Sequence, residues 1–128
     1  VYYGGQQGPD LAALAQRCKL SPEQVIERHQ AGDYLVAMTG FAPGFPYLSG
    51  LDPSLAMPRK ARPLLQVSAG SVAIGGLQTG IYPACLPGGW HIIGQTPLSL
   101  FNPDQPQQLC LLQPGDRVRF IAVQHASN

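Results

Sequence analysis

Aromatic, basic and amide side chains that can bind a ligand gather in four glycine- and proline-rich segments of the chain. The first is GFAPGFPYLSG at residues 40–50, where prolines lock φ and remove backbone donors, so we expect neither a helix nor a central strand. A loop stiffened by residues such as Pro43 loses little entropy on binding, so Phe41, Phe45 and Tyr47 can form a preorganised apolar wall. The alternative is that Phe41 and Phe45 close the end of a barrel. The wall interpretation predicts that Phe45→Ala weakens turnover or partner binding while folding stays largely intact.

The second segment is basic. PRKARP at residues 58–63 holds three of the chain's eight Lys and Arg residues, at Arg59, Lys60 and Arg62. Such a concentration of cations suits a carboxylate or a phosphate group. A solvated basic turn is the alternative interpretation. The segment is therefore a candidate anion-binding corner.

The third segment, GGLQTG at residues 75–80, has glycines on both sides of two polar side chains. Glycine lets a backbone approach a ligand closely, and Gln78 and Thr79 would then supply amide and hydroxyl groups. A plain hairpin turn needs the glycines but not the glutamine. The segment is therefore a candidate for polar contacts to a ligand.

The fourth segment, PGGWH at residues 87–91, carries the chain's one tryptophan directly after two glycines. On a strand, Trp90 and His91 would point to opposite faces of the sheet. Both are candidates for contact with a ligand or a partner. The alternative is a core tryptophan beside a hydrogen-bonded histidine.

A complete catalytic site is not visible in the sequence. The seven Asp and Glu residues belong mostly to expected helix starts, helix faces and turns, so no pair presents itself for acid–base chemistry. The three histidines have no metal-ligand spacing, and neither a P-loop nor a GxGxxG fingerprint nor a biotin site is evident. The catalytic residues are therefore unassigned, and we expect the protein to contribute half a site if it takes part in catalysis.

Composition narrows the class of protein. A chain of 128 residues with 45% hydrophobic and 12% charged residues predicts one folded domain, and a net charge of +1 gives no signal for nucleic acid or a membrane surface. No apolar stretch is long enough to span a membrane. Cys18, Cys85 and Cys110 lie far apart in no CxxC arrangement, which favours reduced thiols and a cytoplasmic protein.

Two short helices followed by many short strands must position the four segments. Pro9 can begin a first helix with apolar residues at helical spacing up to Cys18, and residues 21–24 (SPEQ) form a capping box for a second helix that ends at Gly32. The expected strands are residues 1–3, 34–39, 64–67, 71–74, 80–82, 90–93, 109–112 and 117–121. A type II turn at residues 114–115 precedes the last strand. The pattern predicts one compact, mainly β domain, a barrel or sandwich with short N-terminal helices.

Three motifs in register, GFAPGFPYLSGLDP, AGSVAIGGLQTGIYP and PGGWHIIGQTP, resemble one known family. It comprises the subunit-1-like proteins of allophanate hydrolase, the kinase-inhibitor proteins of the KipI type, and the B subunit of the bacterial ATP-dependent 5-oxoprolinase. The resemblance runs from residues 1–5 to residues 114–120, nearly the whole chain. It implies a cyclophilin-like β-barrel of the carboxyltransferase C/D type as a single domain over residues 1–128. The N-terminal α/β subdomain of typical members is lacking, which indicates that Val1 is an internal start.

The resemblance also implies an activity. The B subunit works with an A subunit and, most directly, a C subunit of the KipA type, to open 5-oxo-L-proline to L-glutamate with ATP as co-substrate. A lactam is a poor electrophile, so phosphorylation of its carbonyl oxygen would activate it, which calls for cations near phosphate and donors to the substrate carboxylate. We therefore expect a cytoplasmic hydrolase component that is inactive alone and binds its partner subunits and a small substrate, without nucleic acid, membrane or metal.

The family's motifs carry over to particular positions. Gly40, Phe41, Pro43, Gly44, Phe45 and Tyr47 match the first motif, Gln78, Thr79, Gly80 and Tyr82 the second, and Gly88, Gly89 and Trp90 the third. Arg59 matches the first basic position of the family pattern PRRxxPR. Lys60 stands at the second position and Leu64 at the last, and lysine cannot replace the bidentate fork of arginine. The candidate substrate- or partner-binding residues are thus Phe41, Pro43, Phe45, Tyr47, Arg59, Lys60, Gln78, Thr79, Tyr82, Trp90 and His91.

Two other functions stay open. A regulatory protein that inhibits a sensor histidine kinase fits the kinase-inhibitor members, and the lack of a catalytic pair is compatible with it. An amidohydrolase component acting on allophanate or a related urea derivative fits the family's older name, although the chain shows no nucleophile beside a base.

Overall fold

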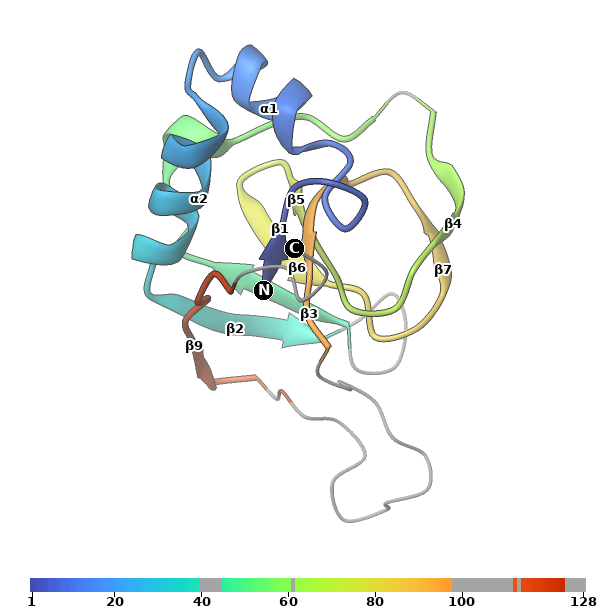
Figure 1. Ribbon diagram of the computed structural model, residues 1–128. Coiled ribbons are helices and arrows are strands. Elements are labelled where there is room, and N and C mark those ends of the chain that lie inside the picture. The colour runs from blue at the N-terminus through green and yellow to red at the C-terminus, as the bar shows by residue number, and fades with distance from the viewer. Residues whose placement is uncertain (40–44, 61, 98–111, 113, 124–128) are drawn as a thin grey trace.

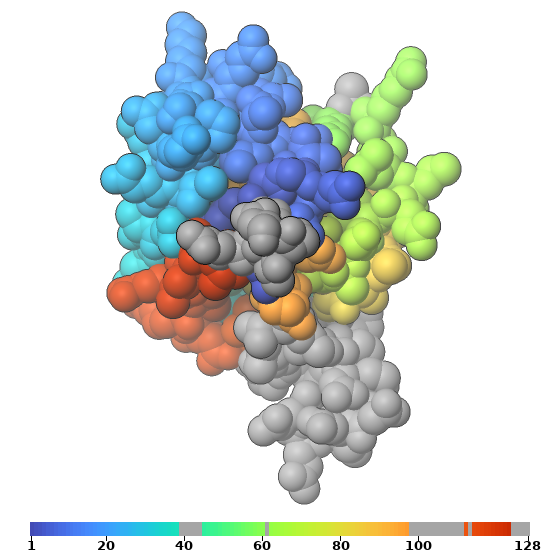
Figure 2. Space-filling model, viewed as in Figure 1, coloured from blue at the N-terminus to red at the C-terminus, as the bar shows by residue number. Residues whose placement is uncertain are grey.

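Two helices lie on one side of a curved sheet, and a two-stranded ribbon lies on the other side in the view of Figure 1. This computed structural model describes residues 1–39, 45–60, 62–97, 112 and 114–123. In the space-filling view, the segment around the ribbon strand at residues 64–67 stands out from the surface, away from the helices (Figure 2). The expected mainly β fold with short N-terminal helices is confirmed.

Both expected helices form, and the second is capped as the sequence predicts. Helix α1 spans Leu11–Arg17 with Asp10 at its N-cap, and α2 spans Pro22–Ala31. The Ser21 hydroxyl accepts a hydrogen bond from the Gln24 backbone N–H at 3.2 Å, and the Gln24 amide oxygen accepts one from the Ser21 N–H at 2.9 Å. This reciprocal pair satisfies two N–H groups that the helix itself leaves unpaired.

The described part of the chain also contains nine strands and one 3₁₀ turn. They are β1 Tyr2–Tyr3, β2 Tyr34–Thr39, β3 Pro46–Ser49, the turn η1 Pro53–Leu55, β4 Leu64–Val67, β5 Ser71–Gly75, β6 Gln78–Ile81, β7 Leu86–Gly88, β8 His91–Gln95 and β9 Arg117–Val118. Seven strands form one sheet in the order β1-β8-β5-β6-β3-β2-β9, and β4 pairs with β7 in the ribbon. All these pairings are antiparallel. Strands β2–β3 and β5–β6 are neighbours in sequence, whereas β1 pairs with β8 and β2 pairs with β9 across most of the chain.

The expectation that no central strand passes through residues 40–50 is wrong for residues 46–49. Strand β3 lies inside the sheet between β2 and β6, with Tyr47 opposite Gly80 and Leu48 opposite Thr79. Pro46 is tolerated because it is the first residue of the strand, where a missing N–H costs little.

Several strand boundaries also differ from those expected. Strand β6 begins at Gln78 rather than at residue 80, β9 covers only residues 117–118, and β7 was not expected. Most of the expected strand at 109–112 lies outside the described residues. The turn before β9 has Gly115 at φ +93°, the left-handed conformation that a type II turn requires at its third position.

The sheet separates two apolar clusters. The helix-side core gathers residues from both helices and the sheet: Tyr3, Leu11, Leu14, Ala15, Val25, Tyr34, Val36, Leu48, Leu51, Leu55, Met57, Val72, Ile74, Ile81, Ile93 and Phe120. The aromatic cluster contains Phe45, Val67, Ala73, Tyr82, Trp90 and Ile92, with Tyr47 and Leu86 packed against it. Side chains alternate across a strand, so Val72 and Ile74 face the helices while Ala73 between them faces the aromatic cluster.

Candidate functional site

The indole of Trp90 forms the base of the candidate site, and two strand glycines make room for it. A Cβ on Gly75 would lie 2.5 Å from the indole atoms Cδ2 and Cε2, and one on Gly80 would lie 2.9 Å from Cζ3. These distances are too short for carbon atoms, so the ring can approach the sheet only over glycine. In the segment at residues 75–80, where the sequence predicts that a ligand approaches the backbone, the Trp90 ring makes this close approach instead.

Three further aromatic rings pack around Trp90. Phe45 meets Tyr82 and Trp90 edge-to-face, at ring-centroid distances of 5.1 and 5.6 Å and interplanar angles of 85° and 87°. Tyr47 lies 5.0 Å from Phe45 and 5.9 Å from Trp90. Perpendicular arrangements at such distances are favourable because the positive edge of one ring meets the negative face of another. The four rings therefore hold one another in fixed orientations.

Phe45 belongs to the core as well as to this site. Only 2% of its surface is exposed, so removing its ring would leave a cavity among the other aromatics. The expectation that Phe45→Ala leaves folding largely intact does not agree with this burial. The barrel-end alternative, in which the ring closes a core, describes Phe45 better.

The phenol of Tyr82 lies against the Pro87–Gly89 segment. A Cβ on Gly88 would overlap the Tyr82 hydroxyl, so any larger residue there would force the Tyr82 ring to shift. Burial raises the pKa of Tyr82, while a hydrogen bond from the backbone N–H of Trp90 and the positive charge of Arg59 partly oppose that rise. The phenol therefore stays neutral at physiological pH, and its hydroxyl can form hydrogen bonds at one side of the site.

A small pocket of about 120 Å³ opens between these rings and a basic residue. We call it the aromatic pocket; its lining is Phe45, Tyr47, Arg59, Tyr82, Trp90 and the segment Pro87–Gly89. The Cζ atom of Arg59 lies 5.9 Å from the centroid of the Trp90 ring. Arg59 is the one charged residue among the described residues that line the pocket. The arrangement combines an apolar box with a single cation at its edge.

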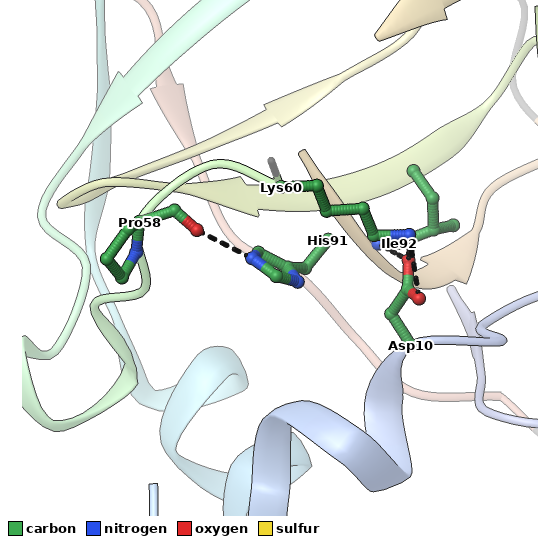
Figure 3. Close-up of polar contacts among 5 residues, drawn as sticks. All are labelled: Asp10, Pro58, Lys60, His91 and Ile92. Atoms are coloured by element: carbon green, nitrogen blue, oxygen red, sulfur yellow. Dashed lines mark hydrogen bonds and ion pairs between the residues drawn. The ribbon is translucent and has the colours of Figure 1, made fainter. Parts of the chain in front are cut away.

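Lys60 and His91 make contacts outside the pocket, shown in Figure 3. The Lys60 ammonium lies 2.9 and 2.8 Å from the two carboxylate oxygens of Asp10, and the same carboxylate accepts a 2.7 Å hydrogen bond from the Ile92 N–H. His91 donates from Nε2 to the Pro58 carbonyl oxygen at 2.7 Å. Trp90 and His91 thus point to different faces, as the sequence predicts, and both are largely buried.

Thr79 lies on the helix side of the sheet, away from the pocket. It is fully buried, donates to the Ala73 carbonyl oxygen at 2.8 Å and contacts Nε2 of His29 at 3.0 Å. Its neighbour Gln78 alternates to the face of Gly80 and is half-buried, but it is not among the described residues that line the pocket. The two polar side chains of the third segment are therefore divided between the two faces.

The structure thus brings together five of the residues proposed from sequence and separates the others. Phe45, Tyr47, Arg59, Tyr82 and Trp90 line one pocket. Lys60, Thr79 and His91 make structural contacts elsewhere, and Phe41 and Pro43 lie outside the described residues. Sequence reasoning missed Asp10 and His29, whose partners lie 50 positions away.

The described residues contain no group of three or more His, Cys, Asp or Glu side chains placed to hold a metal ion. In the same part of the chain, none of the helices has the length and apolar character needed to cross a membrane.

Comparison with known proteins shows which proteins the chain resembles. The chain is 55% identical over 121 residues to the 5-oxoprolinase B subunit of Escherichia coli O157:H7, and 53% identical over 123 residues to that of Bacillus subtilis strain 168. These alignments cover 94% and 96% of this chain but 55% and 51% of the relatives, so the chain spans about half their length.

Solved structures show the same fold. A conserved uncharacterised protein from Pyrococcus horikoshii superposes with a TM-score of 0.93 at 46% identity, covering 99% of this chain and 58% of that one. The urea carboxylase of Kluyveromyces lactis superposes with a TM-score of 0.74 at 23% identity, over 89% of this chain and 11% of that one, which supports the fold alone.

The family model described as the carboxyltransferase domain, subdomain C and D, matches residues 1–112. The resemblance seen in the sequence is therefore confirmed, and the chain belongs to the family of carboxyltransferase domains of subdomains C and D.

Proposed function

We propose that this chain is part of the B subunit of an ATP-dependent 5-oxoprolinase, which opens 5-oxo-L-proline to L-glutamate together with A and C subunits. The observation that carries the proposal is the identity of 51–55% to three 5-oxoprolinase B subunits, over 94–96% of this chain. In this proposal the protein works in the cytoplasm, where its cysteines stay reduced.

The aromatic pocket is the chain's contribution to a shared active site in this proposal. Its volume is about 120 Å³. A small ring fits such a space, whereas a nucleotide needs one of the larger pockets, about 300 Å³ or more, that bind drug-sized ligands. The pocket therefore suits the substrate, and ATP would bind elsewhere in the complex.

The reaction needs more than this pocket supplies. A lactam carbonyl becomes a good electrophile when its oxygen is phosphorylated, and phosphoryl transfer needs several positive charges around the phosphate oxygens. The aromatic pocket has one cation among its described lining residues. The remaining charges would come from the partner subunits, most directly the C subunit, so the chain alone would be inactive.

The test is 5-oxoproline-dependent ATP hydrolysis by the full-length protein, measured with and without its co-expressed candidate A and C subunits. Activity only in the three-component mixture supports a component with a shared site. If an intact three-component complex hydrolyses no ATP in response to 5-oxoproline, the proposal is wrong, and inhibition of a sensor histidine kinase becomes the next function to assay.

A further inference from the structure

Arg59 is placed to bind an anion at the edge of the aromatic pocket. Its guanidinium lies over the Trp90 ring, with Cζ 5.9 Å from the centroid. A guanidinium presents its N–H donors in a planar fork, and a carboxylate can accept two of them side by side. Among the described residues, Arg59 makes no hydrogen bond or ion pair that would occupy these donors.

The charges around the pocket favour a monoanion. Lys60, the next residue, is neutralised by the Asp10 carboxylate at 2.8 Å. Arg62 is exposed and is not among the described residues that line the pocket. One unpaired guanidinium matches the single negative charge of a carboxylate, whereas a phosphate carries more charge than one such group can balance.

The backbone on both sides of Arg59 is fixed by hydrogen bonds. Before it, Met57 exchanges two backbone hydrogen bonds with Gly76, at 3.0 and 2.7 Å, and the Pro58 carbonyl accepts from His91 at 2.7 Å. After it, the Lys60 N–H donates to the Gly89 carbonyl at 2.7 Å, and the Lys60 side chain pairs with Asp10 (Figure 3). These contacts join residues 57–60 to β8, to the β5–β6 turn and to the loop before α1.

We infer that Arg59 binds the carboxylate of the substrate, and that the His91–Pro58 and Asp10–Lys60 contacts are positioning contacts that hold Arg59 over Trp90. The inference rests on the proposed function and adds to it the orientation of the substrate. The five-membered ring of 5-oxo-L-proline lies among Phe45, Tyr82 and Trp90, and its carboxylate faces the guanidinium at the edge. A residue whose backbone is held in place before binding loses less entropy when the ligand arrives.

The first experiment compares Arg59→Gln with wild type in the three-component complex of full-length proteins. The KM for 5-oxo-L-proline rises about 10- to 100-fold, the range expected for loss of a hydrogen-bonded charge, while the KM for ATP changes less than about twofold. As a second ligand, 2-pyrrolidone has the same lactam ring without the carboxylate, and its inhibition constant stays the same in both enzymes. Arg62→Gln is the matched control and leaves all three constants unchanged.

Three outcomes would overturn the role of Arg59. The first is an unchanged KM for 5-oxo-L-proline in Arg59→Gln. The second is a rise in the inhibition constant of 2-pyrrolidone as large as the rise in that KM, which indicates a damaged pocket. The third is an effect of Arg62→Gln equal to that of Arg59→Gln. Failure of the proposed function looks different, because the wild-type complex is then inactive. Equilibrium binding of 5-oxo-L-proline to wild-type and Arg59→Gln full-length protein then decides the inference, and absent or Arg59-independent binding overturns it.

The positioning contacts are tested at Lys60. Lys60→Gln removes the ion pair with Asp10 and raises the KM for 5-oxo-L-proline about 3- to 10-fold with kcat nearly unchanged, and Lys60→Arg, which keeps the ion pair, restores the wild-type KM. A contact with a structural role alone would lower the melting temperature of Lys60→Gln and leave its KM unchanged, and that result would refute the positioning role.

Discussion

His29 occupies the middle of a buried polar chain, and this position predicts how the stability of the protein depends on pH. The Tyr3 hydroxyl lies 2.6 Å from Nδ1 of His29, and Nε2 lies 3.0 Å from the Thr79 hydroxyl oxygen. Because the Thr79 hydroxyl donates its proton to the Ala73 carbonyl, Nε2 must be the donor to Thr79, and Nδ1 accepts from Tyr3. The ring is therefore held in its neutral form.

Protonation of this ring opposes folding, and the size of the effect follows from its pKa. Burial lowers the pKa of His29 from 6.5 to about 3 in the folded protein. Between these values the unfolded state binds a proton that the folded state does not, so stability is complete above pH 6.5 and is lost as the pH falls through this window. From pH 7 to pH 5 the free energy of unfolding falls by about 2 kcal/mol through His29 alone.

Urea unfolding of wild type and His29→Gln at pH 7 and pH 5 measures this loss. Glutamine has no ionisable group and keeps an amide that can bond to Thr79. Wild type is expected to lose about 2 kcal/mol more than the variant over this interval, since the other groups contribute equally to both proteins. Equal losses would refute the assignment. If the variant does not fold, NMR titration of wild type gives the answer, because His29 signals that titrate near pH 6.5 contradict a buried neutral ring.

Two further predictions concern the aromatic cluster. Phe45→Ala lowers the free energy of unfolding by about 3–5 kcal/mol, since a ring that is 2% exposed leaves a cavity; a loss below about 1 kcal/mol in urea unfolding would contradict its place in the core. Gly88→Ala destabilises the protein by about 1–3 kcal/mol, because the new Cβ overlaps the Tyr82 hydroxyl. Adding Tyr82→Phe to Gly88→Ala removes that hydroxyl and recovers part of the loss, whereas purely additive losses in the double variant would show that the overlap is not the cause.

Features that depend on neighbouring residues could be predicted from the sequence. The capping box at Ser21 and Gln24 needs only residues three apart, so the start of α2 is fixed locally. The opposite directions of Trp90 and His91 also follow from strand alternation. The family resemblance rests on long motifs, and these indicate the mainly β fold without any knowledge of strand order.

Two predictions from the sequence are wrong because a general rule does not apply at a particular position. The prolines of residues 40–50 suggested a loop throughout, but Pro46 is the first residue of β3, where the rule against proline does not apply. The sequence pattern places Thr79 with Gln78 in a turn because it predicts a strand that begins at residue 80. Since β6 begins at Gln78, alternation sends Thr79 to the helix side.

Contacts between distant positions could not be predicted from one sequence. In the sequence, Asp10 lies just before a predicted helix and Lys60 lies in a basic segment. None of the residues beside them indicates that the two form an ion pair. The same holds for Gly75 and Gly80, whose need for glycine depends on Trp90. One sequence suggests which residues could bind an anion, but only the packing shows that Lys60 is neutralised and that Arg59 is the cation that lines the pocket.

Strand β6 shows how the fold can separate stability from binding. Its Thr79 side chain bonds to His29 on the helix side, whereas Gly80, the next residue, lies under Trp90 on the pocket side. A change at His29 therefore acts on the helix-side core and reaches the pocket only through the β6 backbone, which β3 and β5 hold from both edges. Phe45 has no such separation, because the same ring fills the aromatic cluster and lines the pocket. The aromatic pocket is thus rigid on the side of the sheet, whereas Arg59 is exposed and can be changed without removing core volume.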